Sequence, residues 1–363
     1  MNYIKLGQAI SRAKVSRCGD NDYPVLSITM KDGIVMQSDK FKKRIASKDI
    51  SEYKVIPAGM LVQGIHMDEG NFGIQDIVPY GIVSPAYTVW TVDESVVFPK
   101  YIEMVLRSPR CIDYYRSKLN GTVNRRGHMS EGDFLGMQIP CPSIEEQKHV
   151  VTTMNQVKQV MISLTEEMTA LDQLIKARFV EMFGEETKHG VPLKECCIDV
   201  RGGGTPSMQH PEYFGGNVPF IKSGDVRGDM VSSGALWLTE KALEETTAKY
   251  VPQGSVLVVN RSAALLREFR AAIAARPVVI NQDIKAFIPK HDYTSEYLLW
   301  AIKIQTQLLL TKVTTVLTSH IDLKDLLELR IANASIELQK EFSAFISQVD
   351  KSKLSPSQSL QIG

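Results

Sequence analysis

The chain has 363 residues, of which 44% are hydrophobic and 23% are charged, and its 42 basic side chains nearly balance its 41 acidic ones. These values are typical of a globular protein, and this length predicts about two domains. The net charge of +1 excludes a protein that coats nucleic acid through bulk charge, so any DNA contact would have to come from local basic loops.

No apolar run approaches the roughly 18 residues of a membrane-spanning helix, and the N-terminus lacks the apolar segment of a secretory signal. The cysteines Cys18, Cys111, Cys141, Cys196 and Cys197 include no C-x-x-C pair, and no histidine spacing completes a zinc site. The sequence therefore predicts a cytoplasmic protein in a reducing environment, with no membrane partner and no metal of its own.

The first half predicts a strand-rich segment followed by a long helix. Residues 1–143 place Gly, Pro, Asn and Asp between short β-branched and aromatic runs, as expected for short strands joined by turns. A helix is predicted over 144–185, because no Pro or Gly interrupts it before Gly184, which supplies the stop. Ser143 followed by Glu146 fits a capping box at its start.

The second half has the same plan. Residues 186–335 again carry strand and turn signals, and residues 336–354 predict a second, shorter helix. Pro356 is expected to interrupt this helix, and the Ser- and Gln-rich residues 355–363 are expected to fray.

Matching segments recur at a nearly constant spacing. Pro57 and Pro252 each precede a Gly and an apolar run, and they lie 195 residues apart. The string SIEEQ ends at Gln147 and the string SIELQ ends at Gln339, 192 residues later. Several matches in the same order predict a tandem duplication whose period is about half the chain, far longer than that of a solenoid repeat.

Apolar residues of the first long helix are spaced alternately by three and four, the pattern of a coiled-coil seam. These residues are Met154, Val157, Met161, Leu164, Met168, Leu171 and Ile175, and the predicted partners in the second helix are Leu338, Phe342, Phe345 and Val349. At 1.5 Å per residue the first helix would be about 60 Å long. The two helices are expected to pair antiparallel, with a globular domain at each end; a helix packed only on its own domain is the alternative.

Two motifs that would indicate chemistry are incomplete. Gly202–Gly204 and Thr205 resemble a phosphate-binding loop, but no Gly-Lys-Ser/Thr occurs in the chain, so an irregular glycine loop is the favoured interpretation. Ser84–Tyr87 (SPAY) resembles the tetrad with which DNA amino-methyltransferases hold a flipped base. Ala86 replaces the second proline, and no glycine-rich segment for S-adenosylmethionine lies upstream, so a turn entering a strand is favoured.

No nuclease, esterase or zinc-protease motif is present either. Asp283–Lys285 is an isolated D-x-K, and His128 and His320 each stand alone, so a capping or packing role is expected for these histidines. The sequence therefore predicts no catalytic residue.

Basic and polar residues near turn signals are the candidate DNA contacts. Arg and Lys can hold phosphates or read guanine, and Asn and Gln can read adenine. For any single residue, a solvated surface loop is the alternative. The candidates are Lys42, Lys43, Arg44, His66, Asn124, Arg125, Arg126, Thr205, Lys222, Ser223, Arg227, Arg261 and Arg267.

Together these segments resemble the specificity subunits of type I restriction–modification systems, over essentially the whole chain. Gly202–Val226 resembles the opening of a target recognition domain, and RIASKDISEYKVIPAGMLVQ through GIVSPAYTVW resembles the middle of another. IPCPSIEEQKHVV and IANASIELQKEFSAFISQVDKSK resemble the two copies of the family's conserved helix. The chain departs from the family in its second helix, which is shorter than the first.

The resemblance implies an α+β fold with two mixed α/β target recognition domains, separated by two long helices that form an antiparallel coiled coil. It also implies a non-catalytic subunit whose domains each read one half of an asymmetric bipartite site in double-stranded DNA, while the helices set the gap. Two methyltransferase subunits would dock on it and carry S-adenosylmethionine, so no cofactor is expected in this chain, and restriction subunits can join.

Two alternatives stay open. The first is an enzyme, either a DNA adenine methyltransferase or a fused restriction–methylation protein that uses the SPAY segment. The second is a truncated decoy subunit, which the short second helix suggests because a shortened helix would offer an incomplete docking surface.

Overall fold

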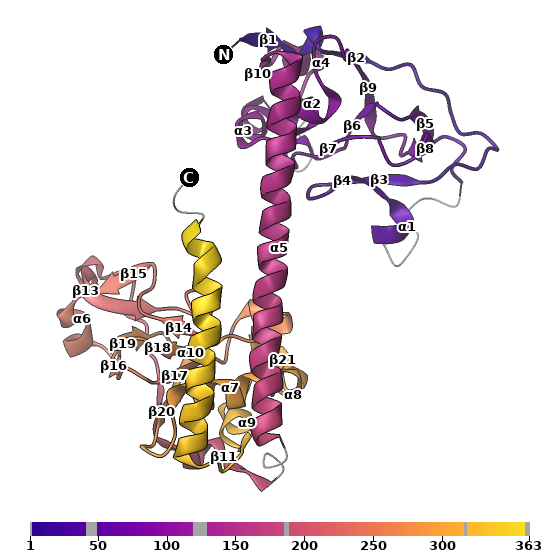
Figure 1. Cartoon of the computed structure of the whole chain (residues 1–363). Coiled ribbons are helices and arrows are strands. Elements are labelled where there is room, and N and C mark those ends of the chain that lie inside the picture. The colour runs from indigo at the N-terminus through magenta and orange to yellow at the C-terminus, as the bar shows by residue number, and fades with distance from the viewer. Residues whose placement is uncertain (1, 41–48, 119–128, 185–188, 316–317, 360–363) are drawn as a thin grey trace. The chain divides into compact units, whose positions relative to one another are not determined.

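The computed structural model describes residues 2–40, 49–118, 129–184, 189–315 and 318–359. The chain divides into two compact units, Met1–Ile162 (unit 1) and Ser163–Gly363 (unit 2). Each unit combines short strands with short helices, and the long helix α5 (Ile144–Phe183) starts in unit 1 and ends in unit 2 (Figure 1).

Unit 1 is built on a sheet whose antiparallel strands follow the order β2 (Ile10–Arg12), β9 (Thr88–Val92), β6 (Leu61–Gln63) and β7 (Phe72–Ile74). Three strand pairs accompany it: β1 (Tyr3–Lys5) with β10 (Gln138–Pro140), β3 (Leu26–Thr29) with β4 (Gly33–Met36), and β5 (Lys54–Pro57) with β8 (Tyr80–Val83). These strands are short because turn-forming residues separate them, as the sequence predicted.

The helices of unit 1 are α1 (Gln37–Lys40), α2 (Pro99–Leu106), α3 (Pro109–Lys118) and α4 (Glu131–Gly136). Aromatic side chains fill the core beneath them. The Phe134 ring of α4 lies 5.7 Å from that of Phe72 and 5.3 Å from that of Trp90, measured between centroids. Because Phe72 and Trp90 lie on β7 and β9, these contacts hold α4 against the sheet.

Unit 2 contains two larger sheets. The first has the order β12 (Cys197–Gly202), β20 (Ile284–Pro289), β17 (Val256–Val259), β18 (Ala271–Ala274) and β14 (Met230–Val231). The second has the order β15 (Leu236–Leu238), β13 (Phe214–Ile221), β19 (Val278–Ile280) and β16 (Tyr250–Val251). Two strand pairs complete the unit: β11 (Val191–Pro192) with β23 (Arg330–Ile331), and β21 (Thr314–Thr315) with β22 (Ser319–His320).

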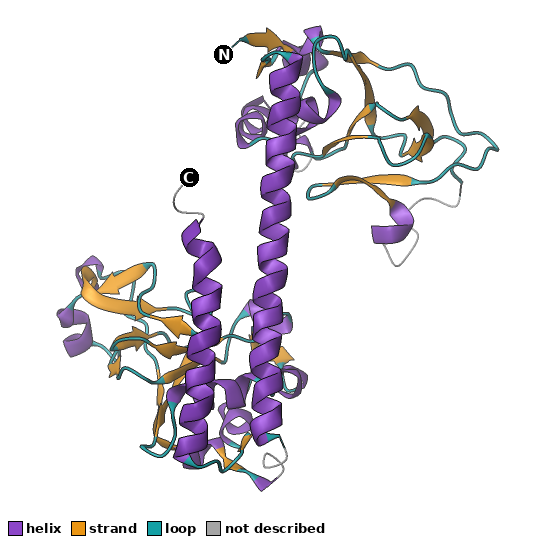
Figure 2. Ribbon diagram, viewed as in Figure 1, coloured by secondary structure: helices purple, strands orange, loops and turns teal. Residues whose placement is uncertain are grey.

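The helices of unit 2, besides the end of α5, are α6 (Glu240–Glu245), α7 (Ser295–Lys303), α8 (Thr306–Thr311), α9 (Leu323–Leu327) and α10 (Ile336–Ser359). Helix α7 contacts α10 as well as strands β17 and β18, so it connects the helical part of the unit with its first sheet. Figure 2 shows that both units contain helices and strands. Its residues 297–302 are all buried, which explains the continuous apolar run YLLWAI.

The connectivity of unit 2 repeats that of unit 1. The order β2-β9-β6-β7 recurs as β12-β20-β17-β18, and the pair β5-β8 recurs as β16-β19. The pair β1-β10 recurs as β11-β23, and α2 and α4 correspond to α7 and α9 in element order. This shared topology confirms the tandem duplication and the mixed α/β fold class predicted from the sequence.

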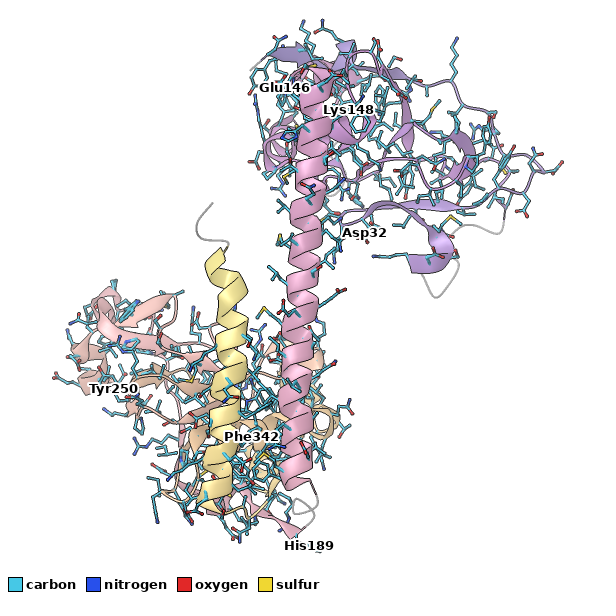
Figure 3. All side chains as sticks on the ribbon, in the orientation of Figure 1. Asp32, Glu146, Lys148, His189, Tyr250 and Phe342 are labelled. Atoms are coloured by element: carbon cyan, nitrogen blue, oxygen red, sulfur yellow. The ribbon has the colours of Figure 1, made fainter. Side chains whose placement is uncertain are left out.

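Within unit 2, α10 runs antiparallel to the last turns of α5. Asp172 pairs with Lys353 at 2.8 Å, and Arg178 pairs with Glu341 at 3.1 Å. Residue numbers therefore rise along α5 where they fall along α10. Figure 3 shows Phe342 between the two helices, where its ring lies edge-on to Phe179. The two helices therefore pair antiparallel over these turns, as the sequence predicted.

The predicted seam divides into a covered and an exposed part. Leu171 and Ile175 pack into the unit 2 core, together with the α10 residues Leu338, Phe342, Phe345 and Val349. Leu164 is half-buried, whereas Met154, Val157, Met161 and Met168 are exposed by 47–61%. Helix α10 has 24 residues against 40 in α5, so its described residues pair only with the C-terminal part of the seam.

The predicted interruption at Pro356 is wrong, because α10 continues to Ser359. Proline lacks the N–H that would bond the carbonyl four residues earlier. That loss costs least near a helix C-terminus, where the last carbonyls have no intrahelical partner in any case. Residues 360–363 lie outside the described part of the chain.

Candidate nucleic-acid interface

A polar turn, Asn281–Asp283, links the two sheets of unit 2. It follows β19 of the second sheet and leads directly into β20 of the first. The Asn281 N–H donates to the Ile221 carbonyl (3.0 Å), and the Ile284 N–H donates to the Asn281 carbonyl (3.2 Å). The turn is therefore held by backbone bonds, which leaves its side chains for other contacts.

The glycine-rich segment lies against this turn. A Cβ atom on Gly203 would lie 2.1 Å from the carbonyl oxygens of Ile280 and Asn281, so only glycine fits there. The Gly204 N–H donates to the Ile280 carbonyl (3.1 Å), and the Thr205 hydroxyl donates to Gln282 Oε1. The segment thus packs on the turn as an irregular loop, in agreement with the interpretation favoured from the sequence.

The loop that follows β17 meets the same turn from the first sheet. The N–H groups of Asn260 and Arg261 both donate to the Asp283 carbonyl, at 3.0 and 3.3 Å. The Arg261 guanidinium Nε lies 4.0 Å from Asp283 Oδ1, and the Arg261 side chain remains 54% exposed. Arg261 is therefore oriented by a carboxylate while its other donors face solvent.

His320 of β22 adjoins Arg261 through an isolated backbone bridge. Its Nε2 lies 3.1 Å from the Thr314 hydroxyl and 3.5 Å from Asp322 Oδ1, so the ring is fixed by polar neighbours. These contacts agree with the packing role expected for His320, whereas His128 lies outside the described residues.

Two asparagines at the centre of this cluster keep an acceptor that has no hydrogen-bond partner in the described part of the chain. They are Asn260 and Asn281, through their Oδ1 atoms. Asn281 is 6% exposed, and its Nδ2 donates to Asp283 Oδ2 (2.9 Å). Buried polar atoms are normally satisfied, so these two acceptors mark the turn as a polar site rather than a packing element.

Lys222 directly follows Ile221, the β13 residue that pairs with Ile280 in β19, and so emerges beside the turn. Its N–H donates to Asp225 Oδ2 (2.9 Å), and both Lys222 and Ser223 are half-buried. Five of the predicted contacts in unit 2 can therefore be placed. Thr205 and Arg261 contact the turn directly, and Lys222 adjoins it through Ile221. Ser223 follows Lys222, and the Arg227 Nε donates to the Gly224 carbonyl (3.0 Å).

Arg267 is exposed at the end of the short helical turn Ala263–Leu266, where its N–H donates to the Ala264 carbonyl (2.9 Å). We call the Asn281–Asp283 turn and the residues that adjoin it, directly or through Ile221 or Arg261, the polar turn cluster. Its members are Thr205, Lys222, Asn260, Arg261, Asn281, Gln282, Asp283 and His320. Asn260, Asn281 and Gln282 were not among the residues predicted from the sequence, although the first two directly follow buried apolar runs, VLVV and VVI.

In unit 1 the corresponding turn is Ser84–Tyr87, between β8 and β9. The Tyr87 N–H donates to the Ser84 carbonyl (3.0 Å), and its half-buried ring packs against the core around Leu26 and Val62. Burial raises the pKa of the Tyr87 hydroxyl. The segment is therefore a turn that enters a strand, as favoured from the sequence, and its aromatic ring is engaged in packing.

His66 follows β6 just as the Arg261 loop follows β17, and it is exposed. Basic side chains gather near the Ser84–Tyr87 turn: the Lys54 ammonium donates to the Tyr87 carbonyl. Burial, with Arg12 and Arg17 nearby, lowers the pKa of Lys54. The remaining unit 1 candidates, Lys42, Lys43, Arg44, Asn124, Arg125 and Arg126, lie outside the described residues.

The main sheet of each unit carries an exposed arginine on its edge strand. Arg12 of β2 pairs with Trp90 of β9, and Arg201 of β12 pairs with Ala286 of β20. The two positions differ by one residue. Leu61 and Val256 correspond through the Pro57 and Pro252 match, so Trp90 corresponds to Phe287, which pairs with Val200 rather than with Arg201. Each is bound by a carboxylate, Arg12 by Glu131 at 2.5 Å and Arg201 by Asp199 at 2.7 Å.

Among the described residues, no three His, Cys, Asp or Glu side chains gather as metal ligands would. Within the same residues, no helix is both long and apolar enough to cross a membrane. The chemistry of the polar turn cluster is that of hydrogen-bond donors, acceptors and one guanidinium, which suits recognition of a polar surface.

The half of the chain that carries this cluster matches a known family. Residues 187–361 match the family model described as "Type I restriction modification DNA specificity domain". The matched residues, slightly less than half of the chain, contain the whole polar turn cluster and α10.

Curated relatives agree with this assignment. The chain is 35% identical over 111 residues to the type I restriction enzyme MjaIX specificity subunit of Methanocaldococcus jannaschii, an alignment that covers 30% of this chain and 25% of that protein. It is 26% identical over 225 residues to the EcoR124I/EcoR124II specificity subunit of Escherichia coli, covering 58% and 55%. The chain thus spans about half or less of the length of these curated relatives.

Solved structures extend the likeness to both units. A chain from a structure titled as the basis of complex assembly and conformational transition of the type I R-M system covers 99% of this chain and 93% of its own, with 17% identity and a TM-score of 0.56. The type I S subunit from M. genitalium covers 99% and 92%, with 12% identity and a TM-score of 0.54. At these identities the likeness concerns the fold. Together the comparisons confirm the resemblance to type I specificity subunits.

Proposed function

We propose that this chain recognises DNA sequence for a type I restriction–modification complex and is itself non-catalytic. The observation that carries the proposal is that the specificity-domain match, residues 187–361, includes the polar turn cluster. A protein with this role works on DNA, so we assign it to the cytoplasm.

In the specificity domain, the exposed members of the polar turn cluster would contact base edges in the major groove. The Arg261 guanidinium has the geometry to read guanine through two donors, and Gln282 has the amide that can read adenine. Asn281 is nearly fully buried, so it would position the turn rather than reach a base. Lys222 and Arg227 would hold phosphates, which fix register but carry no sequence information.

Unit 1 would read the other half of the site. The corresponding turn there is Ser84–Tyr87 rather than Asn281–Asp283, so the chemistry at the same position of the fold differs. Two surfaces with different side chains offer different donors and acceptors to the base edges. We therefore expect an asymmetric bipartite target. Recognition of a symmetric palindrome by this chain alone would contradict the proposal.

The adenine chemistry would belong to two methyltransferase subunits that bind S-adenosylmethionine, and restriction subunits can join them. A docking surface for these partners is the exposed side of α5. Its apolar exposed residues include Val150, Met154, Val157, Val160, Met161, Ile162 and Met168. Exposed apolar patches of this kind typically mark protein–protein contacts.

The test is to co-express the chain with the methyltransferase subunit encoded beside it, in a host without adenine methylation, and to map N6-methyladenine by single-molecule sequencing. One split motif, methylated on both strands, is the expected result and gives both half-sites. Methylation by this chain without a partner would overturn the proposal and favour the enzyme alternative, which also predicts that the isolated chain binds S-adenosylmethionine in calorimetry. A complex that forms but does not methylate would favour the decoy alternative.

A further inference from the structure

Two buried glutamines occupy corresponding places at the starts of the two long helices. Gln147 lies in the first turn of α5 and Gln339 in the first turn of α10, and both side chains are 0% exposed. Glutamine is rarely buried so completely unless its amide is fully hydrogen-bonded. The partners of these two amides therefore indicate why they are there.

The Gln147 amide links two helix starts in unit 1. Its Oε1 accepts from the N–H of Phe98 (2.8 Å), the residue that caps α2. Its Nε2 donates to the carbonyl of Val96 (3.2 Å), just before α2, and to that of Pro142 (2.9 Å), just before α5. One side chain therefore fixes α5 relative to the chain segment that enters α2.

The Gln339 amide does the same in unit 2. Its Oε1 accepts from the N–H of Thr294 (2.9 Å), the residue that caps α7. Its Nε2 donates to the carbonyls of Asp292 and Ala334, each at 3.0 Å. Asp292 precedes α7 and Ala334 precedes α10, so every partner has the same place in the repeat as in unit 1.

A tyrosine adds a second link between the same elements. The Tyr101 hydroxyl of α2 donates to the Pro140 carbonyl of β10 (3.2 Å), and the Tyr297 hydroxyl of α7 donates to the Ala332 carbonyl just after β23 (2.7 Å). A single link would leave a helix free to swing about it. Two links fix the direction of the helix as well as its position.

Direction matters because α5 is long. Its 40 residues, at 1.5 Å each, span about 60 Å. A change of about 10° at its first turn would displace its far end by about 10 Å, which is about three base-pair steps of DNA. A helix that sets the gap between two half-sites therefore needs a fixed orientation at its first turn.

We infer that Gln147 is a positioning residue that sets the direction in which α5 leaves unit 1, and thereby the gap between the two DNA half-sites. Gln339 holds the start of α10 in the same way within unit 2. The inference rests on the proposed function. Neither glutamine is accessible to DNA, so each acts through its helix.

Gln147→Met tests it, because methionine nearly preserves the shape while it removes every amide hydrogen bond. The complex with the methyltransferase subunit would be assayed on duplexes whose half-sites are separated by the best gap, or by a gap one base pair shorter or longer. Deforming DNA to fit a wrong gap costs energy, so the wild type is expected to prefer one gap strongly. In Gln147→Met, the rate on the neighbouring gaps relative to the best gap is expected to rise at least about fivefold.

Two controls separate positioning from loss of stability. Leu106→Ala opens a cavity in unit 1 without removing any partner of Gln147, and Gln156→Met makes the same chemical change at an exposed site of α5. Both are expected to keep the wild-type gap profile. The inference is overturned if Gln147→Met keeps that profile, or if Leu106→Ala broadens it equally at a matched loss of melting temperature.

A milder variant covers the case in which Gln147→Met does not fold. Tyr101→Phe removes only the hydroxyl link to Pro140 and keeps the ring, so it is expected to broaden the gap profile by a smaller factor. An unchanged profile in this variant would then count against the inference. A wild-type complex that methylates without any gap preference would overturn the inference while leaving recognition of the half-sites intact, and a wild type that recognises no DNA would refute the proposed function itself.

Discussion

Phe342 of α10 meets Phe179 of α5 edge to face, with 5.2 Å between ring centroids, and both rings are almost fully buried. Phe183 and Tyr297 lie beside them and meet edge to face at 4.8 Å between ring centroids, so residues from three helices share one aromatic core in unit 2. The α5–α10 pairing therefore belongs to the folding core of unit 2 and is more than a surface contact.

Phe342→Ala is expected to destabilise unit 2 by about 3–5 kcal/mol, because it removes a large buried ring and leaves a cavity between two helices. Urea unfolding followed by tryptophan fluorescence would measure the loss. Leu308→Ala, at a site that is 52% exposed, is the matched control and should lower the free energy of unfolding only slightly. A small effect of Phe342→Ala would show that the helices do not pair in solution as described.

Gly203→Ala is expected to disrupt the polar turn cluster. The new methyl group would lie 2.1 Å from two carbonyl oxygens of the turn, so the Asn281–Asp283 backbone would have to move. Methylation should then be lost, because the half-site that unit 2 reads would no longer be recognised. Gly224→Ala is the control, since a Cβ there meets nothing within 4 Å. Equal activity of the two variants would contradict the placement of the turn at the DNA.

Arg261→Ala is expected to weaken recognition without unfolding the protein, because the side chain is 54% exposed and its ion pair with Asp283 is long. If Arg261 contacts a guanine through two donors, its loss should cost about 1–3 kcal/mol in binding, or roughly tenfold to a hundredfold. Competition binding on the mapped site, with each base pair varied, would locate the contact. Arg276→Ala, at another exposed arginine of the specificity domain, should leave affinity and base preference unchanged.

Val157→Lys is expected to weaken assembly with the methyltransferase subunit, since it places a charge in the exposed apolar stripe of α5. The melting temperature of the chain alone should stay the same, because the site is already solvated. Gln159→Lys adds the same charge elsewhere on the helix and serves as the control. Co-purification that is unaffected by Val157→Lys would move the docking surface to another part of the chain.

The start of α5 should respond to pH through its capping box. The Ser143 hydroxyl and N–H donate to Glu146 Oε2 at 2.8 and 2.9 Å, which lowers the pKa of that carboxyl. A lowered pKa in the folded state contributes stability above the ordinary glutamate pKa, and this contribution is lost as pH falls through the folded value. Ser143→Ala should raise the pKa of Glu146 towards its ordinary value in an NMR titration. An unchanged titration curve would mean that the capping box does not form.

The local features of this chain could be predicted because they depend on neighbouring residues. The bounds of α5 follow from its capping box, its lack of Pro and Gly, and the stop at Gly184. The end of α10 was not predicted, since the cost of Pro356 depends on how close it lies to the end of the helix. The members of the polar turn cluster were predicted only in part, and their contact with DNA stays a prediction. Arg261 and Thr205 were chosen from the sequence, whereas Asn281 and Gln282 were not, because an amide after a strand is common in any loop.

The sequence by itself determined the duplication, since strings such as SIEEQ and SIELQ keep their spacing whatever the fold, and it determined the helix faces, since those repeat every few residues. Only the tertiary structure decided which residues meet. Thr205, Arg261 and Gln282 are far apart in the chain and come together because β13, β17, β19 and β20 pair in a particular register. The register of non-local strand pairing depends on burial across the whole domain, which no local pattern contains.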